Sequence, residues 1–467
     1  MTTSNPSPDT GVNSIGRRLD SLPWTPFHTR VTLALSIGWL LDAFEVNIIA
    51  NVLGILKRIW RITDVQASAL ITVWLVGIMI GALFFGYLAD RFGRRKLFII
   101  TLLLYSTCTV ISALSPGYYF FVVFRFLTAI GVGAEYSAIN AAIGEIIPAK
   151  FRGRASAVVM NFWPVGAILA ALLSLFFINL LPPSTGWRVA FALGAIIALF
   201  TIWLRTILPE SPRWLVRRGR TAEASRVMEQ IEARSRQFDP SLHAAGAAMD
   251  YPGFFRQVVL LIRHHPWRLA LGSVLDFSEA AGYYGIFAFL PLIILPRVHI
   301  AEAQVPWFFL IGNVGAFAGG VLAAALLDKA GRKTTVTMFY SLAAVSMLAM
   351  GAATMAGNAG GVLAAFIVVN FCATGSWVSA YPCFSEIFPT SLRSTGIGFS
   401  VAFGRIGAGL APLALVTLAQ QVSIMASFAM LAGCYLLGAL AMVPWILRGP
   451  EGRGQSLELL GAEAVAE

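Results

Sequence analysis

The chain has 467 residues, of which 57% are hydrophobic and only 12% are charged, with a formal net charge of +11. A soluble domain carries about 25% charged residues, so this composition excludes a water-soluble fold. Lys and Arg stand in short runs between apolar stretches. This pattern argues against a nucleic-acid-binding surface and is typical of loops on the cytoplasmic side of a membrane, where anionic lipids are sufficient partners.

A membrane-spanning helix needs about 20 consecutive, mostly apolar residues. Twelve segments meet this requirement, so we predict an all-α membrane protein with twelve transmembrane helices. The predicted spans, in chain order, are 31–55, 67–88, 97–115, 118–146, 156–180, 188–208, 268–294, 306–327, 334–356, 360–387, 395–420 and 424–447. The polar segment 209–267 separates six spans from six, and Thr221–Arg236 within it has helical character.

The distribution of Lys and Arg predicts the orientation, because cytoplasmic loops carry an excess of both. It predicts that both termini are cytoplasmic, with Lys57, Arg58 and Arg61 as the chief exceptions. The expected organisation is a cytoplasmic N-terminal segment, a six-helix bundle, a cytoplasmic linker with short helices, a second six-helix bundle and a cytoplasmic tail, over residues 1–30, 31–208, 209–267, 268–447 and 448–467. The N-terminal segment is polar and has no signal-peptide core.

Three sequence motifs each occur twice, and the two copies of each are separated by nearly the same number of residues. Asp90-Arg-Phe-Gly-Arg-Arg-Lys96 is echoed by Asp328-Lys-Ala-Gly-Arg-Lys333, an offset of 238 residues (328 − 90). Glu-x-x-Pro-x-x-x-Arg recurs at an offset of 241 (386 − 145), and Asp-x-x-Glu at an offset of 234 (276 − 42). Two six-helix halves in the same orientation are therefore expected. Such pseudo-symmetric bundles suit a transporter that works by alternating access.

The motif Gly86-x-x-x-Asp90-Arg91-x-Gly93-Arg94-Arg95 resembles the signature loop of the major facilitator superfamily. Pro209-Glu-Ser-Pro-Arg-Trp-Leu215 resembles a motif of its sugar-porter and organic-ion branches, and Pro450-Glu-Gly-Arg-Gly454 a degraded form of their last motif. The repeated charges fit a latch at the inner ends of the two halves, although solvated ion pairs are the plain alternative. The expected gate residues are Asp90, Arg91, Arg94, Glu145, Arg152, Asp328, Arg332, Glu386 and Arg393.

Ionisable residues inside spans are costly in hydrocarbon and mark ion or substrate pathways. The candidates for proton coupling are Asp42, Glu45, Arg125, Glu135, Asp276 and Glu279. Each acid could instead lie near water at a helix end or form a structural pair with an Arg. We rank Asp42 first as the proton carrier and Glu135 second, with Arg125 as the counter-charge of Asp42.

A finer resemblance is to the nicotinate (vitamin B3) transporters, the related synaptic-vesicle glycoproteins and the organic-anion symporters. The matching residues are Asp42-Ala-Phe-Glu45, Asn161-Phe-Trp163, Tyr283-Tyr-Gly285 and Ser376-Trp377. The resemblance implies that aromatic side chains face a central cavity, whereas lipid-facing aromatics are the alternative. With Arg405 as a partner for a carboxylate, the expected substrate-binding residues are Trp163, Tyr283, Tyr284, Trp377, Tyr381 and Arg405.

These observations predict a proton-coupled symporter of a small organic anion, most simply a nicotinate-like aromatic carboxylate. A porter of sugars or other metabolites and a non-transporting membrane sensor are the alternatives. No phosphate-binding Gly-x-x-x-x-Gly-Lys loop, metal-ligand spacing or nucleophile motif occurs in the sequence, so no cofactor, metal or enzymatic activity is expected. The expected form is a monomer in a bacterial inner membrane, with substrate, protons and lipids as its partners.

Overall fold

The computed structural model describes residues 18–92, 94–206, 209–217, 219–232, 254–388 and 392–449, and these ranges form helices without strands. Eleven helices among them are long and apolar enough to cross a membrane. Together with α8 (Pro183–Thr206) they make twelve spans. The predicted all-α fold with twelve transmembrane helices is confirmed.

The first half runs from α2 to α8. Its helices are α2 (Pro26–Trp60), α3 (Asp64–Phe92), α4 (Arg94–Ala113), α5 (Tyr118–Ile146), α6 (Ala149–Met160), α7 (Phe162–Leu180) and α8. The second half contains α12 (Pro266–Phe289), a π-helical turn η2 (Leu290–Ile294), α13 (Leu295–Arg297), a short turn η3 (Glu302–Gln304), α14 (Val305–Lys329), α15 (Arg332–Met355), α16 (Ala359–Ile387), α17 (Arg393–Gln421) and α18 (Ile424–Arg448). Between the halves lie α9 (Pro212–Arg217), α10 (Thr221–Glu232) and α11 (Phe254–His264).

Two spans differ from the continuous helices that the sequence predicts. The fifth span breaks at Asn161, between α6 and α7. Pro164 explains the break, because proline has no N–H to donate to the carbonyl of Met160 four residues earlier. The seventh span changes to a π-helical turn at Leu290, one residue before Pro291.

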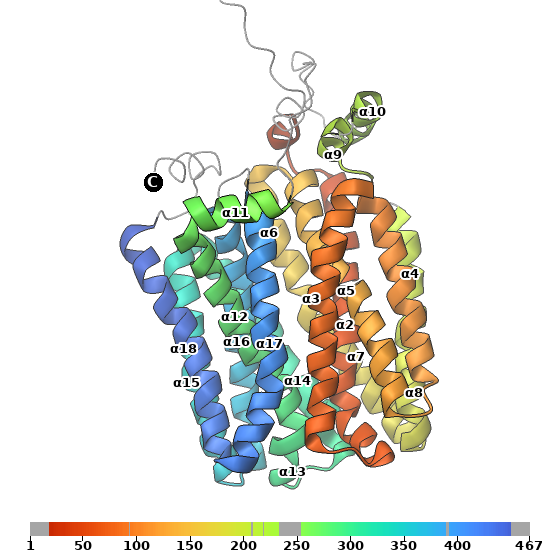
Figure 1. Cartoon of the computed structure of the whole chain (residues 1–467), viewed down its shortest axis with the longest axis vertical. Coiled ribbons are helices and arrows are strands. Elements are labelled where there is room, and N and C mark those ends of the chain that lie inside the picture. Colours follow the sequence, from red (N-terminus) through yellow and green to blue (C-terminus); the bar gives the residue numbers. More distant parts are fainter. Residues whose placement is uncertain are drawn as a thin grey trace, which may run out of the picture.

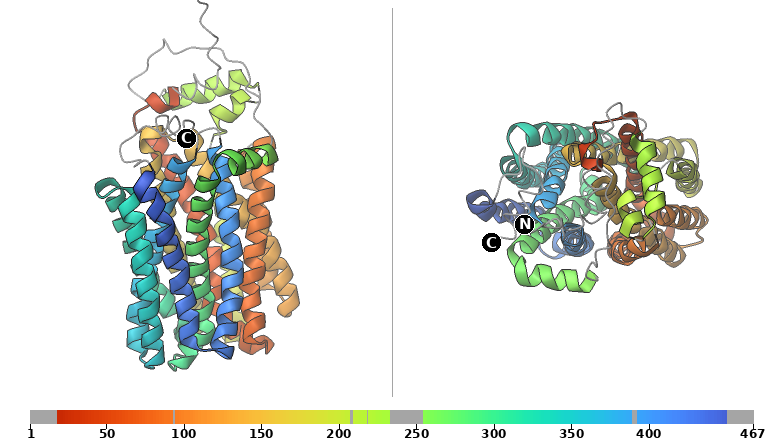
Figure 2. Two further views of the ribbon diagram at one scale, coloured as in Figure 1. Left: turned by 60° about the vertical axis from the view of Figure 1, so that its left-hand side comes forward. Right: turned by 90° about the horizontal axis from the view of Figure 1, so that it is seen from above.

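The two halves pack by the same scheme. In the first half α3 lies along α5, α2 along α7 and α4 along α8, and the equivalent pairs in the second half are α14 with α16, α12 with α17 and α15 with α18. The halves meet where α3 contacts α17 and where α7 contacts α14. Seen from above, the two groups of helices lie on opposite sides of the molecule (Figure 1, Figure 2).

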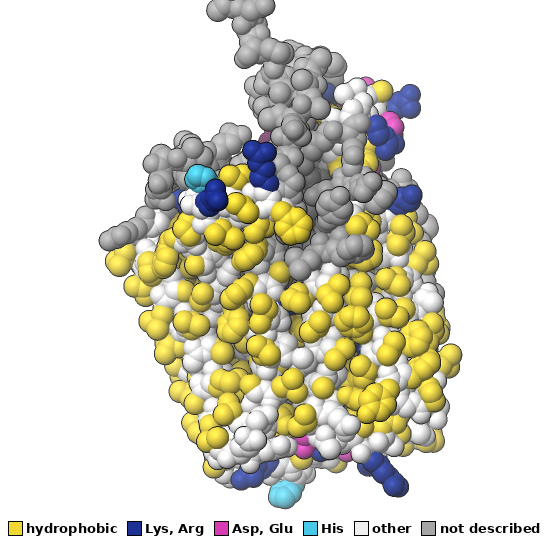
Figure 3. Space-filling view, in the orientation of Figure 1, with side chains coloured by type: hydrophobic (Ala, Val, Ile, Leu, Met, Phe, Trp, Pro, Cys, Tyr) yellow, Lys and Arg dark blue, Asp and Glu magenta, His cyan; other side chains and the backbone are white. Residues whose placement is uncertain are grey.

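The outer surface matches a protein surrounded by lipid. Hydrophobic side chains cover the flanks of the helices, and charged side chains gather at the two ends (Figure 3). The end that carries α9, α10 and α11 is called the linker end below. There, Leu19 and Leu22 of the N-terminal segment pack on α9 and α10, and Arg18 forms an ion pair with Glu232 at 2.8 Å. The helix predicted within Thr221–Arg236 is present over Thr221–Glu232, the described part of that segment.

Glycines set the spacing of the equivalent helix pairs. A Cβ added at Gly81 of α3 would lie 2.1 Å from the carbonyl oxygen of Ile130 in α5, and one at Gly319 of α14 would lie 2.1 Å from that of Phe371 in α16. The glycines are 238 residues apart (319 − 81) and the carbonyls 241 (371 − 130), the same offsets as two of the sequence repeats. Small residues let membrane helices approach closely, and here both halves use them at equivalent positions.

We expect Gly319→Ala to destabilise the protein by about 1–3 kcal/mol, since an overpacked contact forces the backbones apart. Gly433→Ala in α18 is the matched control, because no atom lies within 4 Å of its added Cβ. The melting temperature of each purified variant in detergent measures the effect. Equal melting temperatures for the two variants would contradict the role of Gly319 in α14–α16 packing.

Candidate functional site

Three tryptophans from three helices meet at the interface between the halves. Trp39 of α2, Trp163 of α7 and Trp377 of α16 have ring centroids 5.1–5.8 Å apart. The break at Asn161 places Trp163 in the first turn of α7. All three rings are buried, so they face the protein interior and not lipid. Trp163 and Trp377 were predicted at the centre, whereas Trp39 was not. The three residues are called the tryptophan cluster below.

Tyr283 joins the halves by hydrogen bonds. The indole Nε1–H of Trp163 donates to Tyr283 Oη at 2.9 Å, and that hydroxyl donates to Oδ1 of Asn47 in α2 at 3.3 Å. Tyr284 follows on α12, with its ring centroid 5.2 Å from that of Tyr283. The predicted tyrosine pair therefore lies beside the tryptophan cluster, and one of its hydroxyl groups contacts the opposite half.

Charged residues of the second half form a buried group next to these rings. Arg405 of α17 lies with Cζ 5.6 Å from the ring centroid of Tyr284 and interacts electrostatically with both Asp276 and Glu279. Tyr381 of α16 contacts the same region, with its ring centroid 5.9 Å from that of Trp377. Asp276, Glu279 and Arg405 are called the charge cluster below. All three side chains are buried.

A glycine allows the carboxylate of Asp276 to reach α17. A Cβ added at Gly404 would lie 1.9 Å from Asp276 Oδ2. The carboxylate therefore rests directly on the backbone beside Arg405. Because a larger residue at this position would displace it, Gly404 is a positioning residue for the charge cluster that sequence analysis did not select. The feature of the sequence that could have identified Gly404 is its position next to Arg405, an arginine inside a membrane span.

The first half contains a buried ion pair of its own. Arg125 of α5 binds Glu45 twice, through Nη1 to Oε2 at 3.0 Å and through Nη2 to the backbone oxygen at 2.7 Å. Thr109 donates to the same carboxylate at 3.0 Å, and the guanidinium lies 3.9 Å from the centroid of Trp74. This geometry gives Glu45 Oε2 two donors and places the guanidinium against both the carboxylate and the backbone of Glu45.

The predicted pairing of Arg125 with Asp42 is wrong. The ionic contact of Arg125 goes to Glu45, the residue that the sequence analysis did not choose as its counter-charge. The physical reason is reach. Asp42 lies almost one turn before Glu45 on α2, and the guanidinium is held at the level of Glu45 by the second bond to that residue's carbonyl. Asp42 and Glu135 are both fully buried elsewhere in the first half.

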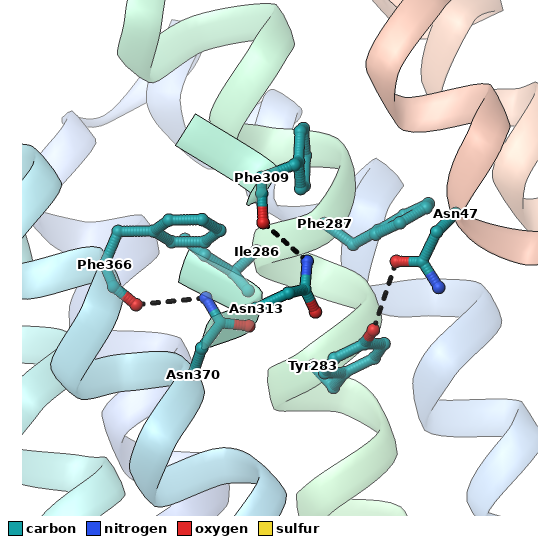
Figure 4. A pocket seen from close by; sticks show the side chains of 8 residues that line it. All are labelled: Asn47, Tyr283, Ile286, Phe287, Phe309, Asn313, Phe366 and Asn370. Carbon is teal, nitrogen blue, oxygen red and sulfur yellow. Dashed lines mark hydrogen bonds between the residues drawn. The ribbon is translucent and has the colours of Figure 1, made fainter. Parts of the chain in front are cut away.

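Three asparagines line a small central cavity that sequence analysis missed. Asn47, Asn313 and Asn370 come from α2, α14 and α16, and the cavity between them has a volume of about 10 Å³, room for about one water molecule. Asn313 and Asn370 each donate a side-chain hydrogen bond to the carbonyl four residues earlier (Figure 4). Each amide thereby uses one of its two N–H donors, and its second N–H and its oxygen are the groups that can bind another polar partner. The sequence feature that could have identified this cavity is the presence of asparagines inside membrane spans, where polar side chains usually bind a partner.

The predicted gate residues are only partly described. The side chains of Asp90, Arg91, Arg94, Glu145, Asp328, Glu386 and Arg393 lie outside the described residues. Arg152 forms an ion pair with Asp20 of the N-terminal segment at 2.8 Å and also donates to the carbonyl of Ile147. Arg332 donates to the carbonyl of Leu327 at 3.1 Å. Both arginines lie where the sequence motifs predicted them, at the linker end.

An ion pair joins the halves at the opposite end. Arg58, at the end of α2, contacts Glu302 of η3 at 3.2 Å, and Lys57 pairs with Asp64. Two of the three exceptions to the charge bias therefore have acidic partners. The pair between Arg58 and Glu302 is a contact between the halves on the side away from the linker, and more than a third of each side chain is exposed there.

We expect Arg125→Gln to destabilise the protein by about 3–5 kcal/mol, because it leaves the buried carboxylate of Glu45 without its cation. Replacing both residues, Glu45→Gln with Arg125→Gln, removes the stranded charge and restores much of that stability. Arg220→Gln is the control, since its pair with Glu223 is exposed. Melting temperatures in detergent measure these effects, and a double variant as unstable as Arg125→Gln would show that charge pairing is not the cause.

Comparison with known proteins gives consistent matches over nearly the whole chain. Residues 30–462 match the profile of the family described as "Sugar (and other) transporter". The niacin transporter NiaP of Acinetobacter baylyi is 30% identical, covering 95% of this chain and 99% of its own length. A putative niacin/nicotinamide transporter NiaP of Bacillus subtilis is 31% identical, covering 93% and 99%. The proton:xylose symporter XylE of E. coli has a similar structure, with a TM-score of 0.74 at 22% identity, covering 94% and 99%.

Proposed function

This chain belongs to the sugar (and other) transporter family of the major facilitator superfamily, and on that premise we propose that it is a proton-coupled symporter of a small organic anion. It is a multi-pass membrane transporter and not an enzyme. The substrate that we propose is a nicotinate-like aromatic carboxylate. Two relatives about 30% identical are named for niacin, which supports this choice.

One observation carries the proposal, namely that an aromatic wall and a buried guanidinium are adjacent. Tyr284 lies between them, with Arg405 over its ring on one side and Tyr283, bonded to Trp163, on the other. Aromatic rings favour offset or edge-to-face contact with another flat ring. The planar guanidinium binds a carboxylate through two parallel hydrogen bonds. A flat ring with one carboxylate satisfies both parts of such a site.

Binding requires a rearrangement from the structure described here. The cavity beside Tyr283 has room for about one water molecule, which is far too little for an organic anion. We propose that the substrate enters between the tryptophan cluster and Tyr284 and separates Trp163 from Tyr283. Alternating access supplies the movement, through opening at the Arg58–Glu302 side or at the motif charges of the linker end.

A sugar or other polyol is the second candidate, and the asparagines favour it. The amide oxygens of Asn47, Asn313 and Asn370 are acceptors that suit hydroxyl groups. Arg405, however, lies in the charge cluster, beyond Tyr284 from these amides. An anion would therefore bind at Arg405 and a polyol at the asparagines. Substitutions at the two places distinguish the two substrates.

We expect Arg405→Ala to abolish uptake of nicotinate, because the carboxylate loses its cation. Arg405→Lys keeps the charge but loses the two-pronged geometry, so we expect uptake to fall by about tenfold or more, a loss of about 1.4 kcal/mol or more. Arg297→Gln is the control, since Arg297 is exposed at the opposite end. Radiolabelled uptake into cells provides the measurement.

The purified Arg405 variants are also heated with nicotinate, benzoate, xylose and glucose. Stabilisation of the unsubstituted protein by the two carboxylates, lost in Arg405→Lys, supports the anion. Stabilisation by the sugars alone, reduced by Asn313→Ala or Asn370→Ala, contradicts the anion and favours the polyol. Counterflow of the stabilising compound in liposomes separates a transporter from a sensor.

We propose that the charge cluster is the proton site, because its two acids lie beside the proposed substrate cation Arg405. A buried carboxylate requires either a cation or a proton, because its desolvation is expensive. In the first half Glu45 has Arg125, and Asp42 and Glu135 are buried there as well. In the charge cluster, Asp276 and Glu279 share Arg405 and repel each other. When an anionic substrate also binds Arg405, the cluster holds three negative charges against one positive charge, and we propose that it takes up a proton together with the substrate.

This proposal replaces Asp42 as the first-ranked proton carrier, since the pairing with Arg125 on which that rank depended is absent. We expect Glu279→Gln or Asp276→Asn to abolish accumulation driven by a proton gradient yet retain counterflow, which needs no net proton movement. Asp42→Asn and Glu135→Gln are tested in parallel in proteoliposomes. If either of these loses accumulation while both cluster variants keep it, the proton site lies in the first half.

We propose the remaining organisation on the same premise. The linker end is cytoplasmic, as its many Lys and Arg residues suggest, and the membrane is the bacterial inner membrane. The bundles over 31–208 and 268–447 move as units around the central site, with Asp90, Glu145 and their counterparts in the second half as the inner latch. The transporter acts as a monomer.

A further inference from the structure

The short helix α11 has one apolar face that the rest of the protein leaves exposed. Phe255, Val259 and Ile262 recur at helical spacing, with 83%, 46% and 51% of their surfaces exposed. The helix lies across the ends of α12 and α17 at the linker end (Figure 1, Figure 2). Leu261 is fully buried, and Thr395 of α17 donates a hydrogen bond to Gln257. An amphipathic helix held in this position lies in the interfacial layer of a bilayer.

Below α11 lies an apolar groove. Its volume is about 320 Å³, and its walls come from three helices, with Ile262 from α11, Leu269 and Ala270 from α12, and Phe399 and Phe403 from α17. Ser273 also lines it, and its buried Oγ has no hydrogen-bond partner. The groove therefore has a mostly apolar lining that suits a hydrocarbon chain. The hydroxyl of Ser273 is one polar atom in that lining that can accept a partner.

Basic side chains stand above the groove. Arg256, Arg263 and His264 of α11 are exposed, whereas the described residues of α11 include no acid. Lys or Arg and His side chains gather over α11, above the band of hydrophobic side chains (Figure 3). Apolar surface below and positive charge above is the distribution that an anionic phospholipid matches.

We propose that this site binds an anionic phospholipid, with one acyl chain in the groove between α12 and α17 and the phosphate on Arg256 and Arg263. Zwitterionic lipids have the same chains but carry no net charge, so the arginines make the site selective for anionic headgroups. The proposal does not depend on which solute the protein transports.

The location gives the lipid an influence on the charge cluster. Phe403 precedes Gly404 and Arg405 on α17, and Ser273 lies one turn before Asp276 on α12. The acyl chain therefore packs against the outer sides of the same two helices that hold Asp276 against Gly404 on their inner sides. A bound lipid stabilises the contact between α12 and α17, so transport becomes sensitive to the lipid composition of the bilayer.

The test compares the purified full-length protein in nanodiscs of phosphatidylcholine alone and of phosphatidylcholine with phosphatidylglycerol carrying the same chains. We expect phosphatidylglycerol to raise the melting temperature by several degrees. Arg256→Gln with Arg263→Gln abolishes this advantage, whereas Arg226→Gln with Arg297→Gln, which removes two exposed arginines elsewhere, retains it. Ala270→Trp fills the groove from its exposed position and also abolishes the advantage.

Inorganic phosphate in phosphatidylcholine nanodiscs separates a headgroup effect from binding of a whole lipid, and we expect it to give no stabilisation. Equal melting temperatures in the two lipids overturn the proposal. So does an advantage that survives in the Arg256/Arg263 double variant or in Ala270→Trp. Full stabilisation by phosphate alone shows an ion site without a lipid chain and likewise overturns it.

Discussion

A charge inside a bilayer must be neutralised by the protein that carries it, because no water is present to solvate it. This constraint organises the interior of the molecule. In the first half Arg125 neutralises Glu45, and Thr109 and a backbone carbonyl complete the contact. In the second half two acids share Arg405. The halves therefore have the same packing but different local pairing: Arg125 contacts one acid, whereas Arg405 interacts with two, beside Tyr284.

The shared frame is visible in the backbone contacts. Gly81 and Gly319 occupy equivalent places, and each allows a carbonyl of the neighbouring helix to approach within the space that a Cβ would fill. Such contacts use no functional side chain, so both halves have them although the side chains of their sites differ. The symmetry of packing and the asymmetry of chemistry are thus carried by different classes of residue.

Much of the fold follows from the sequence because hydrophobic length and charge bias act locally. The number of spans, the two halves and the burial of Trp163 and Trp377 needed no knowledge of tertiary contacts beyond a family resemblance. The partner of Arg125 could not be predicted without tertiary contacts, because Asp42 and Glu45 lie on the same face of α2. The position of α5 along α2 decides which of the two acids Arg125 reaches, and it reaches Glu45. The break at Asn161 and the central position of Asn313 and Asn370 do not follow from the sequence, because a single proline or asparagine in an apolar span fits a continuous or a lipid-facing helix equally well.

The hydroxyl of Tyr283 has a consequence for the cycle of an empty carrier. It receives the indole hydrogen of Trp163 and donates to Asn47, so these three side chains already have partners when no solute is present. After it releases its substrate, the empty transporter must change conformation before it can bind another. Polar groups that are buried without partners would raise the free energy of that empty state. Tyr283 therefore occupies the polar groups of the empty site. A substrate displaces these two hydrogen bonds only if its own interactions with the site are more favourable than they are. Weakly interacting solutes are thereby rejected without any steric barrier.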